Sequence, residues 1–132
     1  MNIVRANGIP IWVTIITLLI GLLGTNLGVR ALLDPTAAMG YIEGAETLGI
    51  SWGGRNAGLG AALILAVLLR NANGYAVALF GSLFREISDI LSMLPDGGGM
   101  LIGIGSFLLV EIVCFIISIR AALTKRLALS GA

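Results

Sequence analysis

Four long apolar stretches dominate the chain, and short polar or turn-rich segments separate them. The stretches cover residues 9–29, 52–69, 75–94 and 100–123. A helix rises about 1.5 Å per residue, so about 20 apolar residues cross the hydrocarbon core of a bilayer. The pattern therefore predicts an all-α fold: a transmembrane four-helix bundle that forms a single domain over residues 1–132.

Turn residues mark the ends of these stretches. Asp34-Pro35 and Gly40 lie in a connector over residues 31–51, which is read either as a functional loop or as a spacer. An alternative reading of the first stretch is a secretory signal peptide with Arg5 before it. The stretch is long for that role, and no small-residue cleavage site follows it.

The basic residues predict the orientation of the chain. If both termini are cytoplasmic, the acidic connectors with Asp34, Glu43, Glu46 and Asp96 lie outside. The cytoplasmic side then holds most of the basic residues, as membrane proteins prefer: Arg5, Arg70, Arg120, Lys125 and Arg126. We therefore expect a multi-pass protein of a bacterial inner membrane.

Composition narrows the function classes. Hydrophobic residues make up 58% of the chain and charged residues 11%, with a mean hydropathy of +1.03, so the bilayer is the expected partner. The net charge of +1 gives no basic footprint for nucleic acid. The chain has one cysteine and no histidine, which excludes an intramolecular disulfide and histidine-ligated haem. No metal site and no cofactor are expected.

Small residues recur at helical spacing and predict close helix contacts. Gly21, Gly24 and Gly28 form one small face, and Gly54, Gly58 and Ala62 form another. Such faces pack helices together in lipid. They would serve contacts within the chain, a homo-oligomer or a membrane partner.

Charged residues inside the apolar stretches are the candidate site. Arg85, Glu86 and Asp89 lie in the third stretch and Glu111 in the fourth, about 16 Å from its start. Charge in a bilayer is costly, so these groups must be paired, hydrated or functional. We expect a polar pocket that opens to the extracytoplasmic side. The residues expected to line it are Asn26, Arg30, Arg55, Asn56, Arg85, Glu86, Asp89 and Glu111.

Several functions fit such a pocket. It would bind a small or lipophilic ligand, such as a quinone-like molecule. Alternatively, Glu111 and Asp89 would be catalytic as acid or base, in an isomerase or cyclase of a lipophilic substrate. A third reading is a non-catalytic subunit of a membrane complex. The structural alternative is that the ion pairs only lock the helices in register, with Arg30 reaching to the interface.

Three motifs carry a resemblance to a known family. The sequence R-N-x-G-L-G-A at residues 55–61, R-E-I-S-D at residues 85–89 and the acid Glu111 resemble the small DoxX-like four-helix membrane proteins. The likeness covers roughly residues 28–122. It implies a compact four-helix bundle. DoxX itself is associated with quinone-linked oxidoreductase complexes, and the resemblance leaves the activity of this chain open.

Overall fold

The computed structural model describes residues 8–40, 43–93 and 101–130, and its elements in these ranges are helices. Four helices are long: α1 (Ile11–Leu33), α3 (Ala45–Leu68), α4 (Ala72–Met93) and α5 (Leu101–Ser130). The fifth, α2 (Pro35–Met39), is short. The prediction of an all-α fold is confirmed for the described residues.

Turn chemistry separates α1 from α3. At the end of α1, the backbone N–H of Asp34 still donates to the carbonyl oxygen of Arg30. The side chain of Asp34 then accepts a 3.0 Å hydrogen bond from the backbone N–H of Ala37 and so caps α2. Gly40 and Gly44 have φ values of +77° and +76°, which glycine adopts without a steric cost. The chain therefore reverses here, as the turn residues predict.

Four helix boundaries differ by three or more residues from those of the predicted spans. α1 continues to Leu33 rather than 29, α3 begins at Ala45 rather than 52, α4 begins at Ala72 rather than 75, and α5 continues to Ser130 rather than 123. The predicted spans ended where the apolar residues end. The helices are longer because Ala, Leu, Glu, Lys and Arg all sustain a helix. The predicted turn at residues 95–99 and the predicted cytoplasmic Arg5 lie outside the described residues.

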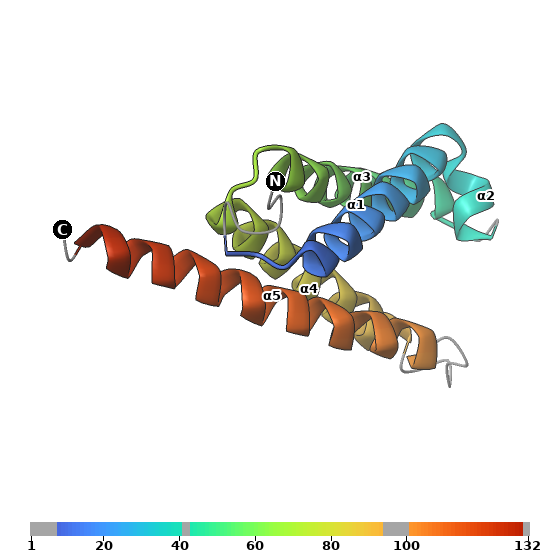
Figure 1. Cartoon of the computed structure of the whole chain (residues 1–132). Coiled ribbons are helices and arrows are strands. Elements are labelled where there is room, and N and C mark those ends of the chain that lie inside the picture. Colours follow the sequence, from blue (N-terminus) through green and yellow to red (C-terminus); the bar gives the residue numbers. More distant parts are fainter. Residues whose placement is uncertain (1–7, 41–42, 94–100, 131–132) are drawn as a thin grey trace.

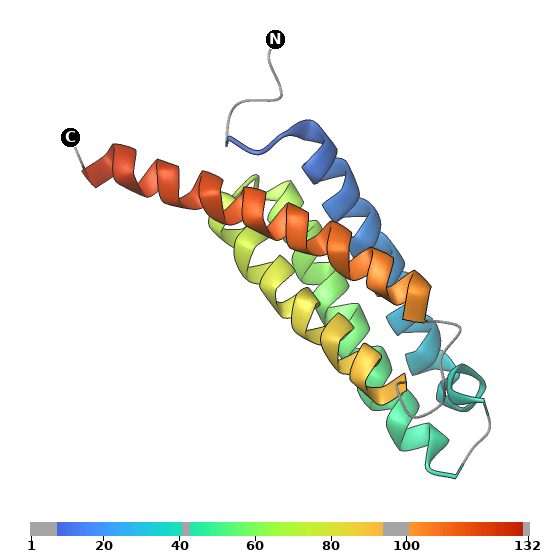
Figure 2. The same cartoon turned by 90° about the horizontal axis from the view of Figure 1, so that it is seen from below.

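The long helices pack as two pairs. α1 lies along α3 and α4 lies along α5, while a smaller contact between α3 and α4 joins the pairs (Figures 1 and 2). The short α2 folds back against α3. The C-terminal part of α5 extends beyond the other helices, as both views show. The long helices therefore pack together in the centre of the fold, and one end of α5 protrudes from it.

Glycine allows α1 and α3 to approach closely. A methyl group on Gly60 would lie 2.6 Å from the carbonyl oxygen of Gly21, which is closer than real Cβ contacts. The predicted small face of α1 is thus the face in contact. The predicted face of α3 does not make this contact: Gly54 and Gly58 are exposed, and Gly53 and Gly60 pack against α1. The two glycine rows of α3 lie about 100° apart around the helix, so spacing alone did not choose between them.

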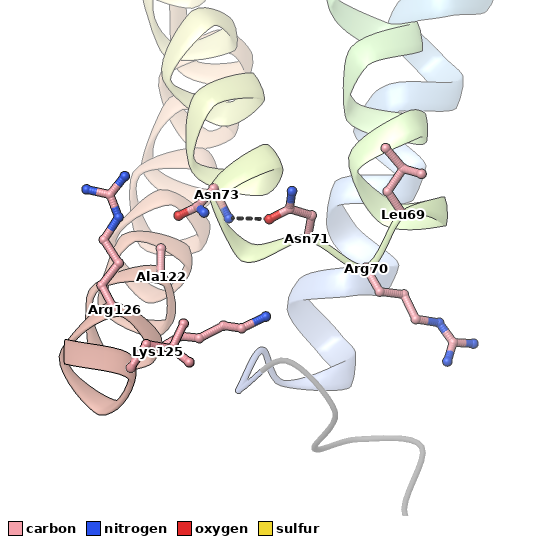
Figure 3. Close-up of a pocket in the computed structure, with 8 residues that line it drawn as sticks. Leu69, Arg70, Asn71, Asn73, Ala122, Lys125 and Arg126 are labelled. Atoms are coloured by element: carbon pink, nitrogen blue, oxygen red, sulfur yellow. Dashed lines mark hydrogen bonds between the residues drawn. The ribbon is translucent and has the colours of Figure 1, made fainter. Parts of the chain in front are cut away.

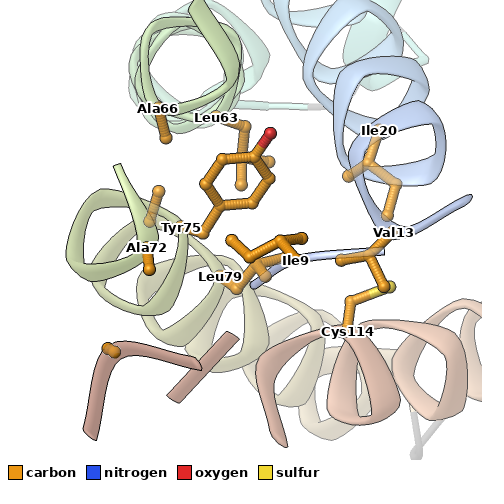
Figure 4. Packing of buried hydrophobic residues seen from close by; sticks show 11 residues of the cluster. Ile9, Val13, Ile20, Leu63, Ala66, Ala72, Tyr75, Leu79 and Cys114 are labelled. Atoms are coloured by element: carbon orange, nitrogen blue, oxygen red, sulfur yellow. The ribbon is translucent and has the colours of Figure 1, made fainter. Parts of the chain in front are cut away.

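A buried apolar cluster lies near the turn between α3 and α4 (Figure 4). Tyr75 is buried in it, and its hydroxyl lies 3.3 Å from the hydroxyl of Thr14 on α1. Cys114 of α5 faces Val13 of α1 across the cluster. The buried members are Ile9, Val13, Ile20, Leu63, Ala66, Ala72, Tyr75, Ala78, Leu79, Cys114 and Ala122.

Large apolar side chains cover much of the outside. They are exposed on all four long helices, and they include Leu19, Leu65, Phe84 and Leu109. By length and composition, two of the described helical segments are suited to cross a membrane: α1 and Gly105–Ser130 of α5. The protein is therefore a helical protein with two candidate membrane spans.

Candidate functional site

The polar side of α4 faces inward. Ser82, Arg85 and Glu86 are buried, with 0%, 7% and 8% of their surfaces exposed. Phe84 and Ile87, which alternate with them, are exposed. Soluble helices show the opposite arrangement, with the charged face toward water. The charged residues of α4 are thus held at the contact with the other helices.

Arg85 is the centre of a buried charged cluster. Its guanidinium group forms an ion pair with the adjacent carboxylate of Glu86. It also lies 3.5 Å from Oε1 of Glu111 on α5, which is fully buried. The hydroxyl of Ser82 donates a 2.9 Å hydrogen bond to the same Oε1. Arg85 therefore connects α4 to α5 through charge and hydrogen bonding.

The backbone of α1 approaches the same guanidinium group at Gly24, where α1 also packs against α3. A methyl group on Gly24 would lie 3.3 Å from Nη1 of Arg85 and 3.5 Å from the backbone carbonyl oxygen of Asn56. The absence of a side chain at Gly24 thus leaves room for the guanidinium group. α1, α4 and α5 therefore all contribute to the surroundings of Arg85.

One oxygen of the cluster has no partner within the described protein. Oε2 of Glu111 is buried and makes no hydrogen bond, although Oε1 of the same carboxyl group has two neighbours. Buried polar atoms are usually hydrogen-bonded, because leaving one unpaired costs about 1–3 kcal/mol. The position of Oε2 therefore singles out Glu111 within the cluster.

A second ion pair joins α3 to α4. Nη2 of Arg55 lies 2.5 Å from Oδ1 of Asp89, and Nη1 of Arg55 lies 3.4 Å from the hydroxyl of Ser88. The Arg55 side chain is 37% exposed and the Asp89 side chain 18%. This pair thus lies at the edge of the molecule, whereas the Arg85 cluster lies inside it. Asp89 is engaged by a cation, which makes it a poor free base.

Three polar residues do not join the cluster as predicted. The side-chain amide of Asn56 is buried but donates to the carbonyl oxygen of Trp52 in its own helix. Asn26 and Arg30 are exposed. Gly28 is buried against α3, and each of these residues lies two positions from it, roughly 200° around the helix. The expectation that Asn26 and Arg30 line the site is therefore corrected.

This correction changes the charge balance. Two arginines, Arg55 and Arg85, face the carboxyl groups of Glu86, Asp89 and Glu111. With every group ionised, the set carries one negative charge in excess. The sequence predicted three arginines against three carboxylates. The observed set is suited to accept hydrogen bonds from a neutral molecule rather than to attract an anion.

Metal ligands do not gather in the part of the chain that the structure describes. No group of three or more acidic or cysteine side chains is placed there to hold a metal ion.

Two cavities are lined by described residues that do not belong to the cluster. One of about 340 Å³ is an apolar groove between α1 and α5, lined by Ile16, Leu19, Ile20, Leu23, Ser106, Phe107 and Val110. Another, of about 570 Å³, lies between the α3–α4 turn and the end of α5 (Figure 3). Its polar and charged lining residues are Arg70, Asn71, Asn73, Lys125 and Arg126.

The sequence reasoning missed this second cavity. It used Arg70, Lys125 and Arg126 only to orient the chain. The available signal was the absence of acidic residues from positions 56–85 and 112–130, the two segments that meet there.

Comparison with known proteins adds no family. No family model matches the chain, and neither curated proteins nor solved structures show significant similarity to it.

Proposed function

We propose that the chain is a multi-pass integral membrane protein in which α1, α3, α4 and α5 form a transmembrane four-helix bundle. The arrangement of α4 supports this proposal most directly. Its apolar side chains form an exposed stripe at helical spacing, while Arg85 and Glu86 are inside. Such a surface suits hydrocarbon rather than water. The stripe consists of Val77, Phe80, Phe84, Ile87 and Leu91.

The distribution of charge supports an orientation. Arg70 lies at the turn between α3 and α4, and it lines one cavity together with Lys125 of α5. Asp34 and Glu46 lie near α2, at the other end of α1 and α3. Basic ends favour the cytoplasm. The proposed topology therefore has cytoplasmic termini in a bacterial inner membrane.

Within this bundle, we propose that the charged cluster binds the polar end of a small lipophilic molecule that enters from the extracytoplasmic side. The buried, unpartnered Oε2 of Glu111 carries this proposal. It is an acceptor next to Arg85, in a set with an excess of carboxyl groups. A neutral hydroxyl, as in a quinol-like molecule, would donate to it. The resemblance of residues 55–61 and 85–89 to DoxX-like proteins is a further reason for this proposal.

Binding of a short-chain quinol tests the role of Glu111. Decylubiquinol would be titrated into purified protein in mild detergent, and quenching of tryptophan emission would report binding. We expect the quinol to bind more tightly than decylubiquinone, which has carbonyl oxygens and no hydroxyl to donate from its ring. Glu111→Gln should weaken quinol binding by about tenfold or more, because hydrogen bonds to charged groups contribute about 1.5–3 kcal/mol.

Glu46→Gln is the matched control. Glu46 lies in the first turn of α3 and is exposed, so the same chemical change there should leave binding unaltered. Equal affinity of the wild type and Glu111→Gln for the quinol would refute the proposed role.

Acid or base catalysis is the second candidate, and the same atom favours it. Glu111 has one oxygen fixed by Ser82 and Arg85 and one oxygen without a partner, whereas Asp89 is held by Arg55. Glu111 is therefore the better candidate for proton transfer. Under this reading, Glu111→Gln abolishes turnover of a bound lipophilic substrate, while Asp89→Asn retains part of it.

A further inference from the structure

The cavity between the α3–α4 turn and α5 has a separate chemistry from the charged cluster. Lys125 extends from α5 toward the turn, whereas the guanidinium groups of Arg70 and Arg126 point away from it on opposite sides (Figure 3). These three basic residues line one cavity of about 570 Å³. A cavity of this size accommodates a small polar group.

The two sequence segments that form this cavity contain no acidic residue. Positions 56–85 supply the second half of α3, the turn and most of α4, and positions 112–130 supply most of α5. Neither segment contains Asp or Glu. Among the described residues, the side-chain carboxylates lie elsewhere, in the charged cluster, at Asp89 and near α2. The cavity therefore favours an anion.

The backbone and amides of the turn add hydrogen-bonding groups. Asn71 precedes α4, and its side-chain oxygen accepts a 3.1 Å hydrogen bond from the backbone N–H of Asn73. The remaining amide hydrogens of Asn71 and Asn73 are donors that line the cavity. Arg70 has a φ of +47°, an uncommon conformation for a residue with a Cβ. This conformation places a basic residue at the turn itself.

Apolar side chains border the same cavity. Leu69 and Leu129 line it, and they are 65% and 72% exposed. α5 is about 45 Å long, which exceeds the ~30 Å hydrocarbon core, so its end reaches the level of the lipid headgroups. A ligand with a phosphate group and hydrocarbon chains matches both the basic centre and this border.

We propose that this cavity binds the phosphate group of an anionic phospholipid. Basic pockets between helices near the cytoplasmic surface recognise anionic headgroups in this way. The inference rests on the membrane placement proposed above. It does not depend on what the charged cluster at Glu111 binds.

Native mass spectrometry of the full chain tests this inference. Protein in detergent micelles would be exposed to equal amounts of phosphatidylglycerol and phosphatidylcholine, and the bound lipids counted. We expect the wild type to retain phosphatidylglycerol in preference to phosphatidylcholine. Lys125→Gln should reduce this preference about fivefold, from about 1 kcal/mol per basic residue near a membrane surface. Lys125→Arg should retain the preference because it keeps the charge.

Arg30→Gln is the control for the loss of one charge. Arg30 is exposed near the end of α1, away from the cavity, so this variant should bind like the wild type. A second arm adds inorganic phosphate, which should not displace the lipid at equal concentration. Displacement would overturn the lipid as ligand and assign the cavity to soluble phosphate compounds.

The failure of this inference can be distinguished from that of the membrane placement. Alkaline carbonate extraction of cell membranes shows whether the chain is integral. Release of the protein by carbonate overturns both proposals. If the protein stays in the membrane but the wild type shows no preference for phosphatidylglycerol, or Lys125→Gln keeps that preference, only the lipid site is overturned.

Discussion

The contact between α1 and α3 makes a quantitative prediction about two glycines that lie two positions apart. A methyl group on Gly60 would lie 2.6 Å from the carbonyl oxygen of Gly21, whereas one on Gly58 would meet nothing within 4 Å. The obstructing atom is backbone, which cannot rotate away as a side chain would. Gly60→Ala must therefore separate the two helices, and Gly58→Ala need not move either.

The expected energies follow from two opposing terms. Overpacking costs about 1–3 kcal/mol, and the upper end applies where backbone obstructs. Replacing Gly by Ala in a helix returns about 1 kcal/mol in both variants. Gly60→Ala should thus destabilise the fold by about 2 kcal/mol, and Gly58→Ala should stabilise it by up to about 1 kcal/mol. The difference between the variants, about 3 kcal/mol, isolates the close approach.

Unfolding by sodium dodecyl sulfate in mixed micelles measures this difference, with circular dichroism and tryptophan emission as independent probes. Gly28→Ala extends the test from the α1 side, because a methyl group there would lie 2.6 Å from the carbonyl oxygen of Gly53. If Gly60→Ala proves as stable as Gly58→Ala, the close packing of α1 on α3 is refuted.

Three further predictions concern the buried polar groups. Arg85→Gln should destabilise the fold by about 3–5 kcal/mol, because it leaves buried carboxylates without a cation; adding Glu111→Gln should restore part of the loss. The Arg55–Asp89 pair should show a smaller coupling in a double-mutant cycle, about 1 kcal/mol or less, since side-chain hydrogen bonds between membrane helices average about 0.6 kcal/mol. The thiol of Cys114 is fully buried, so a maleimide should modify it only after unfolding.

The outcomes that contradict these predictions are as specific. An Arg85→Gln variant as stable as the wild type would show that the central guanidinium group does not hold α4 and α5 together. A coupling at Arg55 and Asp89 larger than that at Arg85 and Glu111 would reverse the assignment of edge and interior. Rapid modification of the native thiol would contradict its packing against α1.

The elements were largely predictable from the sequence because apolar runs and turn residues are local signals. Asp34, Pro35 and Gly40 mark a chain reversal by their own chemistry, and the structure has it there. Helix ends were less predictable, since α3 begins at Ala45 in residues that are polar enough to end an apolar run but still favour helix.

To predict the partners of the charged groups, one must know the rotation of each helix about its axis. The sequence of α4 reveals this rotation, because its apolar stripe repeats with the helical period and Arg85 and Glu86 lie on the other side of the helix. α1 is apolar around most of its circumference, so no polar stripe fixed its facing side. The placement of Arg30 in the site was wrong for this reason, and the charge excess at Glu111 went unseen.

To predict the basic cavity, one must know which distant segments of the chain contact each other. Lys125 and Arg70 are far apart in the sequence. The rule that predicts orientation counts the basic residues on each side of the membrane and does not use the distances between them. Only the packing of α5 beside the α3–α4 turn brings them to one cavity.

The ion pair between Arg55 and Asp89 has a consequence for the biosynthesis of the protein. The two residues are 34 positions apart, so the ribosome completes α3 before the carboxylate exists. At about 5–20 residues per second, the guanidinium group waits about 2–7 s for its partner. During this interval α3 carries an uncompensated charge in an otherwise apolar segment. If α3 and α4 cross the membrane as proposed, the release of α3 into the lipid therefore depends on the arrival of α4, and the two helices should leave the insertion machinery together.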